Sequence, residues 1–166
     1  REAVGVSKLL GGVRFSPDGK LVALGIVDKP YALLLKVPTL DLAAPPRQVP
    51  DAQQQGMCCI AWSRDGSALF LNGDHSGSGP TPLYRFARGG TGEPEAFPVG
   101  NQRFSNMLPM PDGGILFATT TPSLTLLSRS GSVQSHVGTV IVDFRDGQQA
   151  LRMGPHGVTI SLPTAR

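Results

Sequence analysis

Side chains that could hold a metal ion are few, and their spacing does not fit a metal site. The sequence has three histidines and two adjacent cysteines, and no pair of them shows the C-x2-C or H-x3-H spacing of zinc ligands. The residues weighed as ligands are Asp74, His75, His136, His156, Cys58 and Cys59. We therefore expect no metal and no cofactor, and interpret His156 as a turn residue.

Catalytic patterns are also missing. Serines are frequent, but none lies in a G-x-S-x-G nucleophile elbow. Asp18, Asp65 and Asp112 resemble a carboxylate series, yet each stands in the same turn of a different repeat, which predicts separate, turn-capping roles. The run Gly89-Gly90-Thr91-Gly92 lacks the Lys-Ser/Thr ending of a phosphate loop. The sequence thus predicts no catalytic residue, and we expect this segment not to be an enzyme.

The adjacent cysteines have a simple structural interpretation. Neighbours on a strand point to opposite faces of the sheet, so a bond between Cys58 and Cys59 would need a distorted backbone. We interpret them as small apolar residues of a buried strand, with a redox pair as the alternative.

The element around which the chain is organised is a short hairpin. Val13–Gly25, VRFSPDGKLVALG, reads as two strands joined by the turn Ser16-Pro17-Asp18-Gly19. Proline presets φ at the first corner of such a turn, and glycine tolerates a positive φ near its exit. The following apolar run is too short for a helix, so it predicts a strand.

This hairpin recurs at nearly constant spacing. Its copies are IAWSRDGSALFLNG, MLPMPDGGILFATT and a weaker LRMGPHGVTISL, with turn glycines Gly19, Gly66, Gly113 and Gly157 spaced 47, 47 and 44 residues apart. A period in the forties with a hairpin at fixed phase is typical of β-propeller blades. The 21 glycines and 15 prolines leave no room for a helix of average length, about eleven residues. We predict an all-β fold, with Trp62 and Phe15 buried between blades.

The predicted blades are antiparallel and four-stranded. The sequence predicts one propeller segment over 1–166, with blades at approximately 11–50, 57–99 and 104–144 and a partial blade at 150–162. Asp146-Gly147 resembles another hairpin turn, but counting it would shorten the period to 34, so Gly157 is preferred. Three blades and two strands of a fourth make an incomplete ring, which predicts a longer chain or self-association through open blade edges.

At the level of these hairpins the chain resembles the WD-repeat β-propeller superfamily. It departs from that family because no Trp-Asp pair ends a third strand and no Gly-His pair precedes a blade, so apolar stacking should hold the blades together. The chain also resembles, through PLYRF, PMPDGGILFAT and VDFRDGQQALRM, propellers appended to bacterial caspase-like or TIR effector proteins. The first resemblance implies the fold, and the second implies a regulatory domain of a larger protein.

Charge and hydropathy exclude some partners. The net charge is +3, but Arg and Lys are scattered singly, which argues against nucleic-acid binding. The sequence contains no run of 18 apolar residues, so it predicts no membrane span. No signal peptide is visible either, and we therefore expect a cytoplasmic location and no membrane partner.

What remains is a binding surface on polar loops. In WD-repeat propellers the loops that join second to third strands, and those that cross between blades, share one face that commonly binds partners. Mapped here, that face gathers Asp28, Lys29, Tyr31, Asp74, His75, Asn101, Gln102 and Arg103. The favoured hypothesis is a non-enzymatic protein-interaction module that binds a protein partner or the rest of its own chain. The alternatives are a propeller enzyme or substrate gate of a hydrolase, and a periplasmic TolB-like binding propeller.

Overall fold

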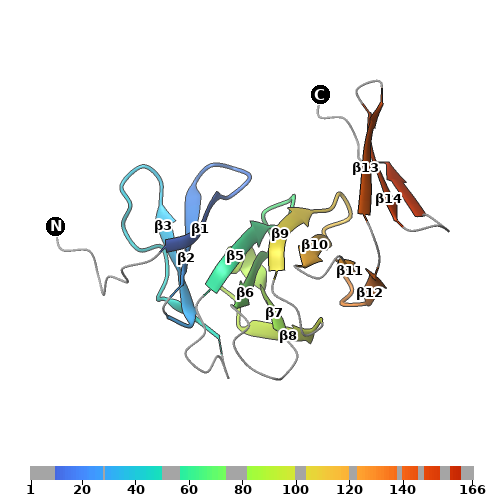
Figure 1. Ribbon diagram of the computed structural model, residues 1–166. Helices are drawn as coiled ribbons and strands as arrows, with labels where there is room; N and C mark the ends of the chain where they lie inside the picture. The colour runs from blue at the N-terminus through green and yellow to red at the C-terminus, as the bar shows by residue number, and fades with distance from the viewer. Residues whose placement is uncertain are drawn as a thin grey trace.

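The computed structural model describes residues 10–27, 29–49, 57–73, 82–99, 104–119, 123–137, 140–145, 148–153 and 158–161. These residues form antiparallel sheets that follow one another along the chain (Figure 1). The first sheet contains β1 (Leu10–Phe15), β2 (Leu21–Ile26), β3 (Tyr31–Lys36) and β4 (Arg47–Gln48). The second contains β5 (Met57–Trp62), β6 (Leu69–Gly73), β7 (Pro82–Phe86) and β8 (Pro94–Pro98).

The third and fourth sheets continue the pattern. The third contains β9 (Phe104–Pro109), β10 (Ile115–Thr119), β11 (Ser123–Leu127) and β12 (Val133–Val137). The fourth contains β13 (Val140–Arg145), β14 (Gln148–Met153) and β15 (Val158–Ser161). In each sheet, strands that are consecutive in sequence are neighbours in space. This is the strand order of propeller blades, so the all-β prediction is confirmed.

The predicted turns close the first hairpin of each of the first three sheets. Gly19, Gly66 and Gly113 have φ of 71°, 72° and 87°, the left-handed conformation that glycine adopts without steric cost. The four-residue segment α1 (Ala87–Gly90) lies between β7 and β8, where the sequence predicts a turn, and Arg88 and Gly89 within it have positive φ of 53° and 62° instead of helical angles. Gly90 within it approaches Leu34 and Leu69 so closely that an added Cβ would lie 3.2 Å from each side chain. The glycine-rich run therefore serves packing between the first two sheets.

The prediction for the fourth sheet is confirmed in one strand pairing and wrong in its order. β14 pairs antiparallel with β15, which is the predicted hairpin, but β13 precedes them and pairs with β14, so that hairpin is the second of this sheet and not the first. The predicted turn residues His156-Gly157, and Asp146-Gly147, lie outside the described residues. The third sheet accordingly ends at Val137 instead of residue 144, and the fourth has three strands instead of two. β13 begins at Val140, earlier than the 47-residue period predicts, so spacing alone placed the first hairpin of this sheet one strand too late.

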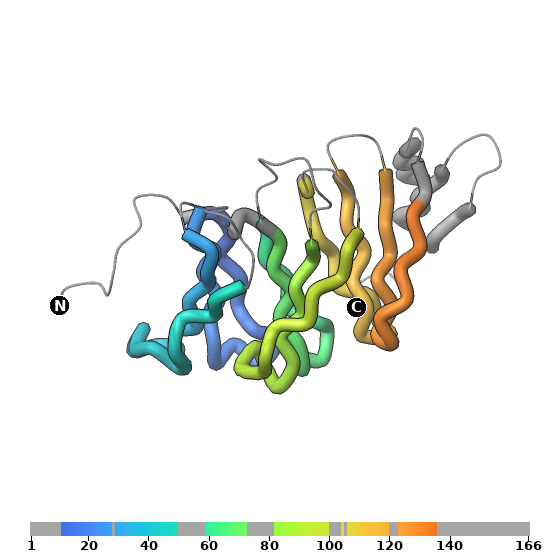
Figure 2. Tube along the Cα trace, turned by 90° about the horizontal axis from the view of Figure 1, so that it is seen from below, coloured from blue at the N-terminus to red at the C-terminus, as the bar shows by residue number. Residues whose placement is uncertain are grey.

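The first three sheets pack face to face and share apolar cores. Figure 2 shows the first three sheets side by side in chain order. The first core combines Ala23, Ala32 and Leu34 of the first sheet with Ile60, Trp62, Leu69, Leu71, Tyr84 and Phe86 of the second. The second core joins the opposite face of the second sheet to the third, with the rings of Phe104 and Phe117 stacked 4.4 Å apart. Apolar stacking therefore holds the described sheets together, as the missing Trp-Asp pairs predict.

One of the two aromatic residues predicted to lie between blades is in its place. Trp62 is only 4% exposed, and its indole Nε1 donates a hydrogen bond of 3.2 Å to the backbone carbonyl of Arg14. Phe15 occupies the equivalent position of the first sheet but is 64% exposed, so its predicted burial is wrong. The reason is that the described residues place a sheet against only one face of the first sheet.

Candidate functional site

The predicted loop surface is described in part. Lys29 is exposed in the turn before β3, and Tyr31 is half-buried at the start of that strand, with its backbone N–H bonded to the Lys29 carbonyl. The other residues of that surface lie outside the described residues, and they are Asp28, Asp74, His75, Asn101, Gln102 and Arg103. The structure therefore brings together only two of the predicted residues, which are neighbours in sequence.

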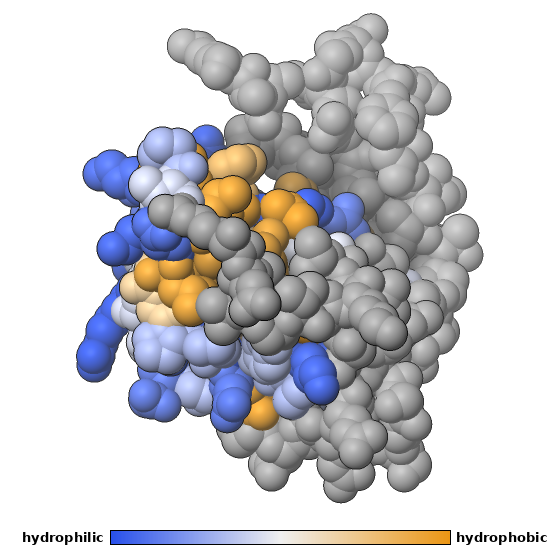
Figure 3. Space-filling view, turned by 90° about the vertical axis from the view of Figure 1, so that its left-hand side faces the viewer, coloured by the Kyte–Doolittle hydropathy of each residue, from blue (hydrophilic) through white to orange (hydrophobic). Residues whose placement is uncertain are grey.

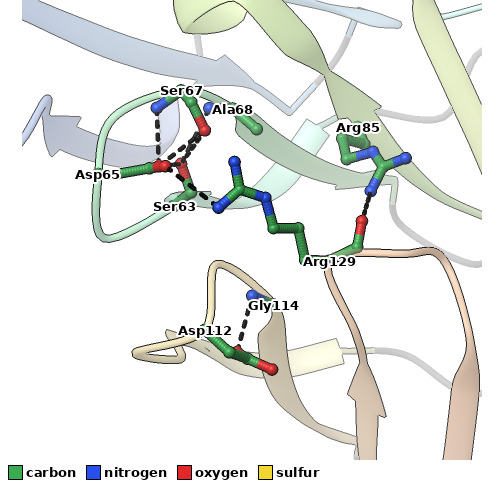
Figure 4. Close-up of polar contacts among 8 residues, drawn as sticks. All are labelled: Ser63, Asp65, Ser67, Ala68, Arg85, Asp112, Gly114 and Arg129. Carbon is green, nitrogen blue, oxygen red and sulfur yellow. Dashed lines mark hydrogen bonds and ion pairs between the residues drawn. The ribbon is translucent and has the colours of Figure 1, made fainter.

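A pocket lies at the opposite end of the strands, where the first hairpins turn. It has a volume of about 360 Å³ and is lined by Arg64, Asp65, Pro111, Gly113 and Arg129. These residues come from the β5–β6 turn of the second sheet and from the β9–β10 and β11–β12 turns of the third. The pocket thus spans the boundary between two sheets. Figure 4 shows two of its lining residues, Asp65 of the second sheet and Arg129 of the third, facing each other.

Each turn that lines the pocket is fixed by its own side chains. The Ser63 hydroxyl donates to Asp65 Oδ1 at 2.7 Å and accepts the backbone N–H of Ala68 at 2.9 Å. Asp65 Oδ1 also accepts the backbone N–H and the hydroxyl of Ser67, at 3.0 and 2.7 Å. Ser16 and Asp18 form the same arrangement in the first sheet. The turn-capping role predicted for these aspartates is confirmed.

The third sheet carries a reduced version of this turn. Met110 stands where the other turns have serine, and Asp112 Oδ1 accepts the backbone N–H of Gly114 at 3.0 Å. The three aspartates lie in different sheets, so they form no carboxylate pair for acid–base catalysis.

Hydrogen bonding keeps Asp65 ionised. The Ser63 hydroxyl, followed by the N–H and hydroxyl of Ser67 and the charge of Arg129, holds the pKa of the Asp65 carboxyl well below its usual range. Because the folded-state pKa lies below the unfolded one, this stabilisation is present above about pH 4 and is lost as the pH falls through the folded-state pKa. A carboxylate held ionised in this way is a poor general acid near neutral pH.

The Ser63→Ala variant tests this assignment. Removing the hydroxyl takes away the largest cause of the lowered pKa, so the midpoint of the Asp65 carboxyl titration should move upward. The measurement is the pH dependence of the side-chain carboxyl carbon shift of Asp65 by NMR, in the wild type and in the variant. A matched Ser130→Ala change, in an exposed turn, should leave that midpoint in place. An unchanged midpoint in Ser63→Ala would contradict the assignment.

Two arginines give the pocket its accessible charge. Arg64 is exposed, and the Arg129 guanidinium, 71% exposed, lies 4.0 Å from Asp65 Oδ2, the outer limit of an ion pair. Such exposed pairs contribute little to stability, so these groups remain accessible to another molecule. Guanidinium groups donate well to carboxylate and carbonyl oxygens.

A third arginine links the two sheets behind the pocket. Arg85 donates from Nη1 to the backbone carbonyl of Arg129 at 2.7 Å and pairs with Glu95 on the neighbouring strand. Its guanidinium also lies over the Phe97 ring, 5.0 Å from the ring centroid. Arg47 makes the corresponding link between the first two sheets, to the Thr91 carbonyl at 2.8 Å. The pocket is therefore built on turns that are tied together across the sheet boundary.

Sequence reasoning missed this pocket, because its residues meet only after the sheets pack. The available signal was the repeated pair Ser-Arg at the start of two turns, Ser63-Arg64 and Ser128-Arg129. Among the described residues, no group of three His, Cys, Asp or Glu side chains could hold a metal ion. Within the same part of the chain, no helix is long and apolar enough to cross a membrane. Cys59, half-buried, directs its thiol toward the Phe104 carbonyl at 3.6 Å and forms no disulfide.

Comparison with known proteins identifies the fold. The structure matches U3-55K with a TM-score of 0.70 at 14% identity, covering 96% of this chain and 53% of that one. It matches the C-terminal WD40 domain of Sif2 with a TM-score of 0.62 at 16% identity, covering 90% and 59%. It also matches hydrazine synthase of Kuenenia stuttgartiensis with a TM-score of 0.66 at 13% identity, covering 97% and 53%.

These likenesses show the fold. The chain has a WD40-type β-propeller fold, and its described residues form three antiparallel four-stranded blades and one three-stranded sheet. It spans about half the length of the WD40 structures it matches. No protein-family model matches the sequence, and no curated protein matches it either.

Proposed function

We propose that this chain is a non-enzymatic protein-interaction module, whose partner docks at the turn end of the second and third blades. The observation that supports this proposal is the pocket between those blades, where the guanidinium groups of Arg64 and Arg129 are exposed. The turn that holds Arg129 is hydrogen-bonded to the second sheet through Arg85. The WD40 likeness supports protein interaction at the general level. The pocket's one carboxylate is held ionised by turn hydrogen bonds, which suits a structural role better than catalysis.

The pocket suits a polypeptide partner with acidic or carbonyl groups. Its lining combines two cationic side chains with Pro111 and the glycine backbone of Gly113, so charge and apolar surface lie side by side. Rigid scaffolds that present such turns are common sites of binding. The loop surface at the other end, from Asp28 to Arg103, is the competing docking site that the sequence predicts.

The two surfaces can be separated by paired variants. An Arg64→Gln/Arg129→Gln double variant keeps most of each stem and removes both charges, whereas Asp28→Lys/Asp74→Lys/Arg103→Glu reverses charge at the loop surface. We expect the first to lose the partner that co-purifies from the native source and the second to keep it. Because Arg64 and Arg129 are exposed, the double variant should change stability by only about ±0.5 kcal/mol.

The control is Arg14→Gln, which removes an exposed charge from the first blade without touching either surface. Partner loss in the triple variant alone would place the docking site on the loop surface and refute the pocket. Partner retention in all three variants, or turnover of a substrate by the purified wild-type chain, would refute the interaction-module proposal.

A further inference from the structure

The turns that line the pocket break the repeat of the hairpin at one position. A shift of 47 residues relates Pro17, Arg64 and Pro111, so the second turn carries arginine where the other two carry proline. Proline presets φ at this corner of a turn, and arginine gives up that advantage. In a repeated element, a residue that departs from the local rule is expected at a functional position. Arg64 is therefore the turn residue whose side chain is expected to serve binding.

The two sheet boundaries use this corner differently. At the first boundary Pro17 lies beside the turn of the second sheet, and its Cδ is 3.4 Å from the place that a Cβ on Gly66 would take. At the second boundary the equivalent glycine is Gly113, and the Cδ of Arg129 lies 3.3 Å from an added Cβ there. The stem of Arg129 thus packs on the turn glycine, as proline does one blade earlier. The side chain of Arg64 is exposed and lines the pocket.

The charged groups that line the pocket leave an excess of one positive charge. They are the two guanidiniums of Arg64 and Arg129 and the carboxylate of Asp65. Asp65 uses Oδ1 within its own turn and faces Arg129 with Oδ2, at 4.0 Å. The turn hydrogen bonds lower the pKa of this carboxyl, so it stays ionised at neutral pH. A contact of 4.0 Å between exposed groups is weak, so both guanidiniums can bind a further acceptor.

This charge balance favours a carboxylate ligand over a phosphate. A carboxylate carries one negative charge, which matches the excess, and its two oxygens suit guanidinium donors. A phosphate monoester carries about −1.5 to −2 at neutral pH, so it would bring surplus negative charge close to Asp65. Asp112, exposed between the lining residues Pro111 and Gly113, adds to that repulsion. The ring of Pro111 offers an apolar surface to the methylene groups of an acidic side chain.

The outer face of the first sheet offers a carboxylate no comparable site. Val13 and Phe15 are 46% and 64% exposed there, and Figure 3 shows apolar residues gathered over the first sheet on this side. Their equivalents one repeat later, Ile60 and Trp62, are each 4% exposed in the core between the first two sheets. A carboxylate on such a face would lose hydration without gaining hydrogen bonds. The pocket is therefore the better of these two surfaces for an acidic group.

We propose that Arg64 and Arg129 hold one carboxylate of a polypeptide partner between them, and that Asp65 makes the pocket select a carboxylate over a phosphate monoester. This inference rests on the proposed function and adds the chemical group that the pocket recognises. The carboxylate belongs to an acidic side chain or to a chain end, which share this chemistry.

Titration with short peptides, followed by NMR, tests the proposal on the purified protein. The probes are acetylated glycine–serine hexapeptides. Three have an amidated end and a central glutamate, glutamine or phosphoserine, and the fourth lacks these residues and ends in a free carboxylate. We expect the glutamate peptide to shift the Nε–H signals of Arg64 and Arg129 and to bind about fivefold more tightly than the glutamine peptide. The phosphoserine peptide should bind no more tightly than the glutamate peptide.

The fourth peptide identifies the source of the carboxylate. Tighter binding of either carboxylate peptide than of the glutamine peptide supports the proposal. The stronger of the two then assigns the group to a side chain or to a chain end.

Variants separate the roles of the charges. Arg64→Pro restores the residue of the other two turns, so the fold should persist while the preference for glutamate is lost. Arg64→Gln, which keeps a flexible side chain at this corner, should lose the same preference. Asp65→Asn keeps an oxygen for the turn hydrogen bonds and removes the charge, so the phosphoserine peptide should gain about threefold in affinity, more than the glutamate peptide gains. The control Arg14→Gln, on the first sheet, should bind every peptide as the wild type does.

Equal binding of the glutamate, glutamine and free-ended peptides, or tighter binding of phosphoserine than of glutamate by the wild type, would overturn the proposal. A folded Arg64→Pro protein that keeps the preference would do the same. Failure of the docking proposal is distinguishable: the glutamate peptide would bind at the pocket while the Arg64→Gln/Arg129→Gln variant still retained its native partner. Partner loss in that variant without any peptide preference would leave docking intact and refute the carboxylate.

Discussion

Replacing Trp62 by alanine should lower the free energy of unfolding by about 3–5 kcal/mol, the usual cost of removing a large buried aromatic side chain. The indole is 4% exposed and lies in the core that joins the first two sheets, so its removal leaves a cavity between blades. It also leaves the Arg14 carbonyl without the hydrogen bond from Nε1. The measurement is urea unfolding of the 166-residue chain, followed by circular dichroism.

The chain offers a matched control at the same position of the repeat. Phe15 is equivalent to Trp62 in sequence but is 64% exposed, so Phe15→Ala should cost far less in the same chain. Trp62→Phe keeps an aromatic ring in the core and loses the hydrogen bond, which is worth about 0.5–1.5 kcal/mol. A cost of Trp62→Ala no greater than that of Phe15→Ala would contradict the packing of the first two blades.

This pair of aromatic residues also shows how far the sequence can predict the fold. The hairpins are local, so serine, proline, aspartate and glycine at fixed offsets were sufficient to place three turns and the all-β class. Burial is not local: Phe15 and Trp62 occupy the same repeat position and differ only in what lies against them. Repeat phase predicts which face of a strand is apolar, but only the neighbouring sheet decides whether that face is buried.

The candidate site was harder to predict than the fold for the same reason. The aspartates were correctly interpreted as turn residues, because Asp18, Asp65 and Asp112 each bond backbone within their own turn. The pocket depends instead on Arg129 of the third sheet reaching Asp65 of the second, 64 residues earlier in the chain. Met110, which replaces the serine of the other turns, does not change this turn, because Gly113 and Asp112 keep its backbone geometry.

The pocket and the apolar outer face of the first sheet suggest two separate uses of the same architecture. The turn end of the blades carries exposed guanidiniums, whereas the outer face of the first blade carries apolar side chains in an interface register. Polar groups at the ends of strands favour reversible binding, and extended apolar faces favour permanent packing.

Gly114→Ala should destabilise the third blade more than its position in the repeat suggests. Lys20 and Ser67 stand at the equivalent positions of the first two turns, so the sequence alone predicts that a side chain is tolerated there. In the structure, a Cβ on Gly114 would lie 2.6 Å from the Leu127 carbonyl oxygen, a backbone atom of the adjacent strand β11. The strands β10 and β11, paired at Ile115 and Leu127, would have to separate. Such overpacking costs about 1–3 kcal/mol, and a backbone obstacle places this variant at the upper end.

Gly19→Ala separates this steric cost from a purely conformational one. Gly19 has a φ of 71° and no atom within 4 Å of an added Cβ, so alanine there carries only the left-handed backbone cost of about 1–2 kcal/mol. Both variants are compared by urea unfolding, and amide hydrogen exchange in β10 and β11 locates the damage. We expect Gly114→Ala to be the less stable of the two, with exchange accelerated in the third blade. A Gly114→Ala chain at least as stable as Gly19→Ala would show that β11 does not approach Gly114 as closely as the structure places it.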